Sequence, residues 1–161
     1  GTFDSNTTTP PTDPYITFLN NAGIPPGFQA IDADPDRDGY PNLLEYLYGT
    51  NPATGHSRPV PVQGFNTLRG DVLNTLKPGA GLDPVEFYYT ANIRLPKTLP
   101  AGTNLDLQST LNLPNFGDGS STMVPYGTPV DDGDFIIQSY YHAEGRSNAA
   151  RAFWRLSATR N

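Results

Sequence analysis

Residues 34–45 read Asp34-Pro35-Asp36-Arg37-Asp38-Gly39-Tyr40-Pro41-Asn42-Leu43-Leu44-Glu45, and this stretch decides how the first part of the chain folds. A calcium loop offers oxygen ligands at its first, third, fifth, seventh, ninth and twelfth positions, with a glycine at the sixth for the sharp turn. The ligand positions hold Asp34, Asp36, Asp38, Tyr40 (through its carbonyl), Asn42 and Glu45, and the glycine is Gly39. Aspartates placed so closely repel one another unless a cation lies between them. The sequence therefore predicts a site for one Ca²⁺ ion, with a solvated acidic turn as the alternative.

Two short helices are expected to flank this loop. The first covers residues 15–22, where Asp13 can serve as the N-terminal cap. The second covers residues 42–48 and ends at Gly49, a residue type that favours helix termination. Because Glu45 belongs to the second helix, a bound ion would fix that helix relative to the loop.

The chain that enters the loop differs from that of a calcium sensor. Pro25, Pro26 and Pro35 prevent a long incoming helix, so no pair of long helices exists that an ion could open. Extracellular calcium modules bind the ion with dissociation constants of about 10⁻⁴–10⁻³ M. We therefore expect the ion to hold the segment in shape, and to act neither as a switch nor in catalysis.

Apolar residues alternate with polar ones in the rest of the chain. The clear runs are residues 85–93, 103–109, 134–141 and 152–158, and weaker candidates lie at 59–65, 72–76 and 122–126. Such runs, separated by turns rich in Gly, Pro and Asp, are typical of an antiparallel sandwich. The predicted fold is mainly β: an Ig-like antiparallel β-sandwich preceded by a short helical arm that carries one calcium loop. Its expected parts are an extended arm (1–14), a helix–calcium loop–helix segment (15–52), a connector (53–64) and the β-sandwich (65–161).

Composition excludes several classes of protein. The 161-residue chain has a formal net charge of -6, which argues against nucleic acid as a partner because phosphate binding requires a basic surface. It contains no cysteine, so neither disulfides nor thiolate metal sites are expected. No segment reaches the apolar length of a membrane span. Since residue 1 is Gly, we interpret the N-terminus as processed and expect a secreted protein of the cell surface.

No catalytic motif stands out in the sequence. His56 and His142 are the only histidines, and neither has a nucleophile motif beside it. The acidic run of Asp131, Asp132 and Asp134 could form a second metal site, but such a run is more often a β-turn with a solvated face. We expect a protein that is not an enzyme.

The motifs together support a family resemblance. They are the helix with its glycine (16–23), the calcium loop followed by Tyr46 (34–46), Gly-Thr-Asn-Pro (49–52) and Phe-Trp-Arg-Leu (153–156). With these features the chain resembles a domain that recurs near the C-terminus of exported surface proteins of environmental, biofilm-forming bacteria. The loop is also similar to those of dockerins and thrombospondin type 3 repeats. A dockerin carries two such loops and this chain carries one, which argues against cohesin binding.

The N-terminal arm suggests a structural function. Residues 1–14 are rich in Thr and Pro and can extend, and the arm is predicted to use Thr2, Phe3, Thr7, Thr8 and Thr9 for assembly. Inserted into a neighbouring subunit as an added strand, in donor-strand exchange, such an arm would build a pilus-like fibre. Copies of the same chain are therefore the expected partners, in a homopolymer.

Glycans enter the interpretation in two ways. Asn6-Thr7-Thr8 matches the N-glycosylation pattern, and the run Thr7, Thr8 and Thr9 would suit O-linked sugars. The alternative function is a calcium-stabilised carbohydrate-binding module, or a spacer or anchoring domain. A sugar platform would be drawn from Tyr88, Tyr126, Tyr140 and Tyr141, although alternation allows only one of Tyr140 and Tyr141 to face outward.

Overall fold

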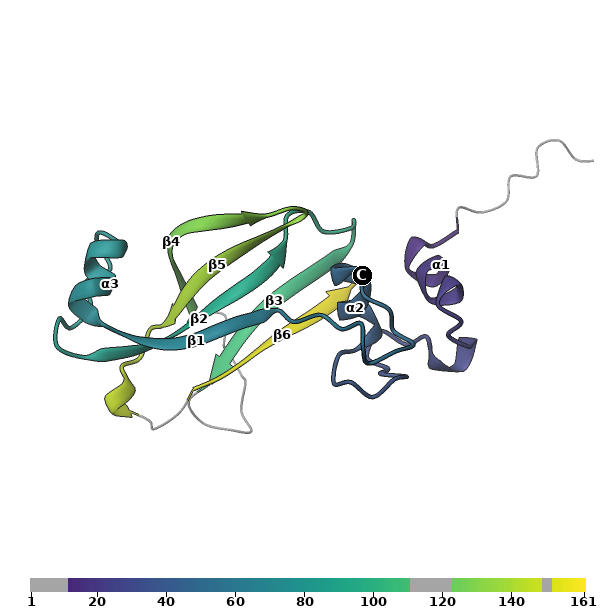
Figure 1. The fold of residues 1–161 in the computed structure, drawn as a ribbon, viewed down its shortest axis with the longest axis horizontal. Helices are drawn as coiled ribbons and strands as arrows, with labels where there is room; N and C mark the ends of the chain where they lie inside the picture. The colour runs from purple at the N-terminus through teal and green to yellow at the C-terminus, as the bar shows by residue number, and fades with distance from the viewer. Residues whose placement is uncertain (1–11, 111–122, 149–151) are drawn as a thin grey trace, which may run out of the picture. The chain divides into compact units, whose positions relative to one another are not determined.

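The structure is a computed structural model that describes residues 12–110, 123–148 and 152–161. The chain divides into two compact units, residues 1–59 and residues 60–161 (Figure 1). The boundary between them falls inside the connector that the sequence predicts at residues 53–64. Each unit has its own secondary structure and is described separately.

The first unit contains short helices. Helix α1 spans Pro14–Asn21, a single 3₁₀ turn, η1, spans Pro26–Phe28, and helix α2 spans Asn42–Tyr48. The side chain of Asp13 caps α1, and Gly49 ends α2 in the left-handed conformation with a φ of 70°. Both predicted helices are thus confirmed, with α1 shifted one residue toward the N-terminus, and so are the cap Asp13 and the terminating Gly49.

Helices α1 and α2 pack on one another through apolar side chains. Tyr46 of α2 lies edge-on to Tyr15 of α1, with ring centroids 5.6 Å apart. The buried apolar residues of the unit are Tyr15, Leu19, Ile24, Leu43, Leu44, Leu47 and Tyr48. Each such side chain contributes about 1.5–3 kcal/mol when it is fully buried. This packing holds α2 in place, and with it the polar side chains that α2 carries.

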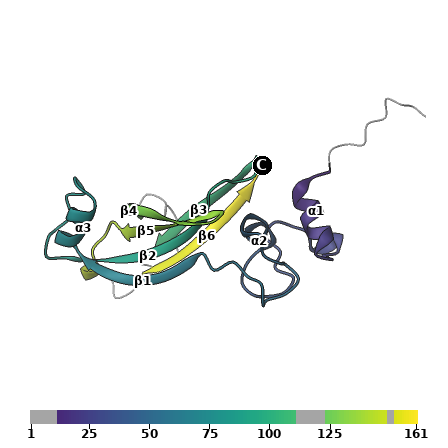
Figure 2. The same cartoon turned by 45° about the horizontal axis from the view of Figure 1, so that its top comes forward.

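The second unit is built from antiparallel strands. Its larger sheet has the order β1 (Val62–Arg69), β2 (Phe87–Pro96), β5 (Phe135–His142) and β4 (Met123–Asp132). A second sheet pairs β3 (Thr103–Thr110) with β6 (Phe153–Arg160), and these two strands run side by side in Figures 1 and 2. The structure therefore confirms that this unit is mainly β and antiparallel, and its two sheets are consistent with a sandwich-like arrangement. All four clear alternating runs, and the weak ones at 59–65 and 122–126, fall on strands.

The two faces of the larger sheet have different surroundings. On one face, His142 of β5 makes an edge-to-face contact with Trp154 of β6, with ring centroids 6.5 Å apart. Strand alternation places the buried residues Ala91, Ile93 and Met123 on this same face. This face therefore turns toward the β3–β6 pair, and we call the opposite side the outer face.

Helix α3 (Gly70–Leu76) replaces the weak strand candidate at residues 72–76, and that prediction was wrong. Its Leu73 is fully buried and packs with Tyr88 and Tyr141 on the outer face of the sheet. A side chain at Gly70 would collide with the carbonyl oxygen of Asp83, so the close approach of these two segments requires a glycine. As a helix, this segment buries Leu73 in the cluster with Tyr88 and Tyr141, a long-range contact that the local pattern does not reveal.

Candidate metal centre

The three aspartates of the loop lie together in the first unit. Ligand atoms of Asp34, Asp36 and Asp38 are all within 4.8 Å of one another. Backbone N–H groups hold all three carboxylates: Gly39 donates to Asp34 Oδ2 at 2.9 Å, Asp38 donates to Asp36 Oδ1 at 3.2 Å, and Tyr40 donates to Asp38 Oδ1 at 2.9 Å. These contacts coil the backbone around its own acidic side chains. Proximity alone does not identify a metal site, because acidic loops of this kind also occur without an ion.

Gly39 and Tyr40 occupy the positions that the loop pattern assigns to them. Gly39 has a φ of 92°, a left-handed conformation that favours glycine. Tyr40 follows it at the seventh position of the pattern, where the ligand is a backbone carbonyl oxygen. The sequence therefore places a glycine where the backbone needs one.

Asn42 supplies the ninth position from the start of α2, and its side chain is fully buried. Its Nδ2 donates to the carbonyl oxygens of Phe28 and Ala30, at 2.8 and 3.1 Å. Its backbone N–H donates to Ala33 at 2.8 Å. With both amide hydrogens used in this way, the side chain is fixed and Oδ1 is left without a hydrogen-bond partner.

Glu45 supplies the twelfth position one turn later on α2, and it too is fully buried. Thr50 Oγ1 donates to Glu45 Oε1 at 3.1 Å, while Oε2 has no partner. The sequence predicted Glu45 as a ligand but missed the role of Thr50. The available signal was its position directly after Gly49, where the chain turns back toward the helix that it has just left.

Unpartnered oxygens set this loop apart from an ordinary acidic turn. Within the described residues, the buried side-chain polar atoms that lack a hydrogen bond are Asp36 Oδ2, Asp38 Oδ2, Asn42 Oδ1 and Glu45 Oε2. Each belongs to a residue that the loop pattern names as a ligand. A buried polar atom without a partner costs roughly 1–3 kcal/mol, and more when it is charged, so native proteins rarely tolerate several together. All four atoms are oxygens that accept hydrogen bonds, so either a cation or a hydrogen-bond donor could satisfy them.

The environment of the loop disfavours the ionised form of two of its carboxyl groups. Burial, followed by the negative charge of Asp38, raises the pKa of Glu45 from 4.5 to about 8. The Asp36 pKa is raised as well, first by burial and then by a hydrogen bond with Asp34 and the charges of neighbouring aspartates. Carboxyl groups that resist ionisation in this way are expected where anions crowd together without a counter-charge.

The second acidic run has a different environment, at the β4–β5 turn. Asp131 forms an ion pair with Lys97 at 3.1 Å, and Asp132 forms one with Arg94 at 2.7 Å. The hydrogen bond from Lys97 lowers the pKa of Asp131. Asp134 is exposed in the same turn, and its carbonyl oxygen accepts a hydrogen bond from the Lys97 backbone. Basic neighbours therefore already balance two of the three carboxylates.

The predictions for the N-terminal arm concern residues outside the part of the chain that the structure describes. These are the assembly residues Thr2, Phe3, Thr7, Thr8 and Thr9 and the glycosylation candidate Asn6. Two of the tyrosines predicted as a sugar platform, Tyr88 and Tyr141, are buried in the cluster around Leu73. That part of the platform prediction is wrong, because helix α3 covers both rings.

Comparison of the chain with protein-family models, with curated proteins and with solved structures found no match. The resemblance to a surface domain of exported bacterial proteins therefore stays a prediction. Among the helices that the structure describes, none is both long enough and apolar enough to cross a membrane.

Proposed function

We propose that this chain is a non-catalytic structural module in which residues 34–45 bind one Ca²⁺ ion. The ligands would be the side chains of Asp34, Asp36, Asp38, Asn42 and Glu45, together with the carbonyl oxygen of Tyr40. The observation that carries this proposal is the set of four buried, unpartnered oxygens on four of these residues. A cation would satisfy all four and would offset the burial and the negative charge of Asp38, which together raise the pKa of Glu45.

The donor set favours calcium over other common metals. Every proposed ligand atom is an oxygen, and four of the six ligands are carboxylates, which suits a hard divalent cation. Zinc sites in proteins are usually built from Cys and His, and neither residue occurs in this loop. Magnesium requires nearly ideal octahedral geometry and keeps several of its waters, which fits a loop with this many protein ligands less well.

A structural role follows from where the ligands lie in the chain. Asp34, Asp36 and Asp38 belong to the loop, whereas Asn42 and Glu45 belong to α2. An ion held by both groups would tie the loop to a helix that is itself anchored by its packing on α1. The segment before the loop contains the single turn η1, so there is no long incoming helix for calcium to move.

The proposal extends to an exported structural subunit of a bacterial surface fibre, assembled from copies of this chain. Among the described strands, β1 and β4 are the outermost strands of the larger sheet, and each has one side open for strand addition. Phe65 on β1 and Val130 on β4 are 67% and 61% exposed, which provides apolar contacts for an added strand. Strand addition by the arm at residues 1–14 of a neighbour would continue without closing, and so would form a filament.

Isothermal titration calorimetry of the full chain, freed of metal and titrated separately with CaCl₂ and MgCl₂, tests the calcium proposal. The expected result is one calcium site with a dissociation constant of about 10⁻⁴–10⁻³ M or tighter, and weaker magnesium binding. Absence of saturable calcium binding would refute the proposal. A preference for magnesium would refute the assignment of the metal.

A further inference from the structure

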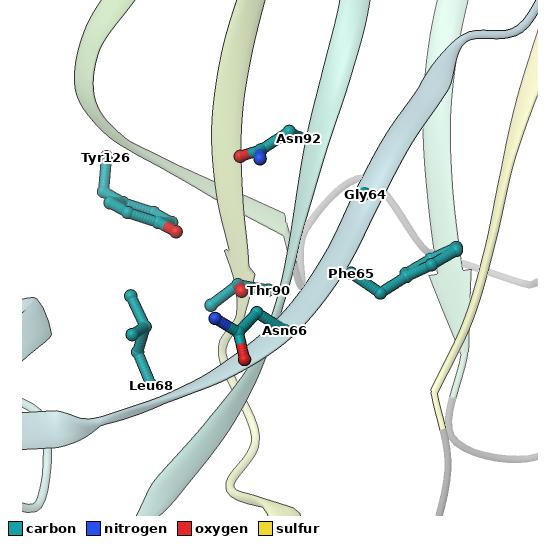
Figure 3. A pocket seen from close by; sticks show the side chains of 7 residues that line it. All are labelled: Gly64, Phe65, Asn66, Leu68, Thr90, Asn92 and Tyr126. Carbon is teal, nitrogen blue, oxygen red and sulfur yellow. The ribbon is translucent and has the colours of Figure 1, made fainter.

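The outer face of the larger sheet contains a partly open hollow in the second unit. Its volume is about 190 Å³, and its lining residues come from β1, β2 and β4 (Figure 3). It borders the cluster around Leu73 of α3, against which the lining residues Leu68 and Tyr126 pack. The residues that line it are Gly64, Phe65, Asn66, Leu68, Thr90, Asn92 and Tyr126. In Figure 3 the ring of Phe65 points away from the other labelled side chains, so this residue contributes mainly its backbone.

Strand pairing brings the polar members of this set together. Gly64 pairs with Asn92 and Asn66 pairs with Thr90 across β1 and β2, and Tyr126 on β4 lies two strands away from Asn92 in the same register. Because paired residues point to the same side of a sheet, these side chains share the outer face. Figure 3 shows the hydroxyl group of Tyr126 directed over the sheet toward the space between Asn92 and Thr90.

Gly64 provides the room for this hollow. It lies where the pairing of β1 with β2 shifts register, and a Cβ atom built on it would meet nothing nearer than Asn92 Nδ2 at 3.9 Å. Its backbone has no positive φ, so conformation does not explain the choice of glycine. A strand glycine marks either a β-bulge, which the register shift here indicates, or a place where another molecule can approach the backbone closely.

The polar groups that face the hollow have unused hydrogen-bonding capacity. Asn66 Oδ1 accepts from the Thr67 backbone at 2.8 Å, and Asn92 Oδ1 accepts from Ser139 Oγ at 2.7 Å. These bonds orient both amides, and neither Nδ2 group has a partner among the residues that the structure describes. The same is true of Thr90 Oγ1 and the Tyr126 hydroxyl group within the described part of the chain. Two donors and two hydroxyl groups thus converge on one space, in fixed positions.

The lining also defines the chemistry of what can bind. It contains no Asp, Glu, Lys, Arg or His, so a charged ligand would leave water without gaining a counter-charge. Tyr126 and Leu68 supply apolar surface to the hollow. The amide groups of Asn66 and Asn92 and the hydroxyl groups of Thr90 and Tyr126 supply its hydrogen-bonding groups. A molecule that combines an apolar ring face with many neutral hydroxyl groups matches both features, and a pyranose sugar is such a molecule.

We propose that this hollow binds a single residue of a neutral glycan. Tyr126 contacts the face of the sugar ring, Asn66 and Asn92 donate to its oxygens, and Thr90 exchanges hydrogen bonds with its hydroxyl groups. The site lies in the second unit and does not depend on the calcium proposal, which concerns the first. It also differs from the platform expected from the sequence, of which only Tyr126 takes part.

Nuclear magnetic resonance of the ¹⁵N-labelled full chain in calcium tests this proposal. Glucose, galactose, mannose, xylose and N-acetylglucosamine are titrated separately, with glucuronate as the charged comparison. At least one neutral sugar should shift the side-chain amide signals of Asn66 and Asn92 to saturation, in the millimolar range or tighter, and glucuronate should not. The proposal is overturned if no neutral sugar shifts these signals saturably, if the shifts map elsewhere, or if glucuronate alone binds.

Two variants separate binding at this hollow from general effects on the fold. Gly64→Val fills the space with a side chain that the strand tolerates, and it should abolish the shifts while the spectrum remains dispersed. Asn66→Ala should weaken binding about threefold to tenfold, the loss expected for one hydrogen bond. Asn104→Ala, which removes an exposed amide on β3, is the matched control and should leave affinity unchanged. Unaltered affinity in Gly64→Val would contradict the assignment.

Discussion

Thr50 donates a hydrogen bond of 3.1 Å to one carboxylate oxygen of Glu45 and leaves the other oxygen without a partner. Glu45 is therefore held in a fixed orientation inside the first unit while half of its bonding capacity is unused. Asn42 repeats the arrangement one turn earlier, because its amide hydrogens are bound and its oxygen is not. In the proposed calcium site, both side chains would present these unpartnered oxygens to the ion.

The variant Thr50→Val removes the hydrogen bond to Glu45 and keeps the shape of the side chain. Groups that orient a metal ligand typically change metal affinity by about 10–100-fold when they are removed. We expect calcium affinity to fall by about tenfold, measured by calorimetry. Thr75→Val, on the exposed side of α3, is the matched control and should bind calcium as the unaltered chain does. Equal affinity in both variants would show that Thr50 does not position a ligand.

The variant Glu45→Gln should lose most of the stabilisation that calcium confers. An ion at about 100 times its dissociation constant stabilises the folded state by about 2.7 kcal/mol. The melting temperature of the variant should therefore fall in calcium, yet be unchanged or slightly higher in chelator, where the repulsion of Glu45 by the aspartates is gone. Glu144→Gln, an exposed site in the second unit, is the control. An equal loss of stability with and without calcium would exclude Glu45 as a ligand.

Stability of the ion-free chain should depend on pH through Glu45. Burial first, and then the charge of Asp38, raises its pKa in the folded chain from 4.5 to about 8. Between these values the folded chain holds a proton that the unfolded chain releases, so stability falls as the pH rises through this window. Thermal melts in chelator across the window should show this decline, and Glu45→Gln should lack it. Parallel pH profiles for the two proteins would contradict the prediction.

Deletion of residues 1–12 tests assembly by the N-terminal arm. Negative-stain electron microscopy of the full chain in calcium should show filaments that fray in chelator. The truncated chain should give dispersed particles with an unchanged melting temperature, because the deleted segment precedes the cap of α1. Filaments formed by the truncated chain would exclude arm exchange, and dispersed particles from the full chain would exclude the fibre.

Local sequence signals predicted the helices and most of the strands. Asp13 and Gly49 mark the ends of α1 and α2 through interactions within a few residues, and those signals can be read directly from the sequence. The alternating runs likewise fall on strands. Helix α3 escaped prediction because Leu73 is buried against Tyr88 and Tyr141, which are distant in sequence. The same packing removes these two tyrosines from the surface.

The two candidate sites, the 34–45 loop and the hollow on the outer face, also differ in how much of each can be predicted from local sequence. The proposed calcium site is a contiguous pattern, so all of its candidate ligands can be named from the sequence, whereas the hydrogen bond from Thr50 to Glu45 cannot. The hollow on the outer face combines residues from β1, β2 and β4, whose register is set by pairing over long separations. The sequence around Gly64 does not indicate that this residue lines a hollow. That becomes apparent only from its pairing with Asn92 on β2.

The most direct test of calcium binding is a crystal structure grown in CaCl₂, with an anomalous difference map calculated from data collected at long wavelength. One peak should lie among Asp36 Oδ2, Asp38 Oδ2, Asn42 Oδ1 and Glu45 Oε2, with carboxylate oxygens about 2.3–2.6 Å from it. Saturating calcium with no peak inside the 34–45 loop, or with a peak only elsewhere on the chain, would contradict the account.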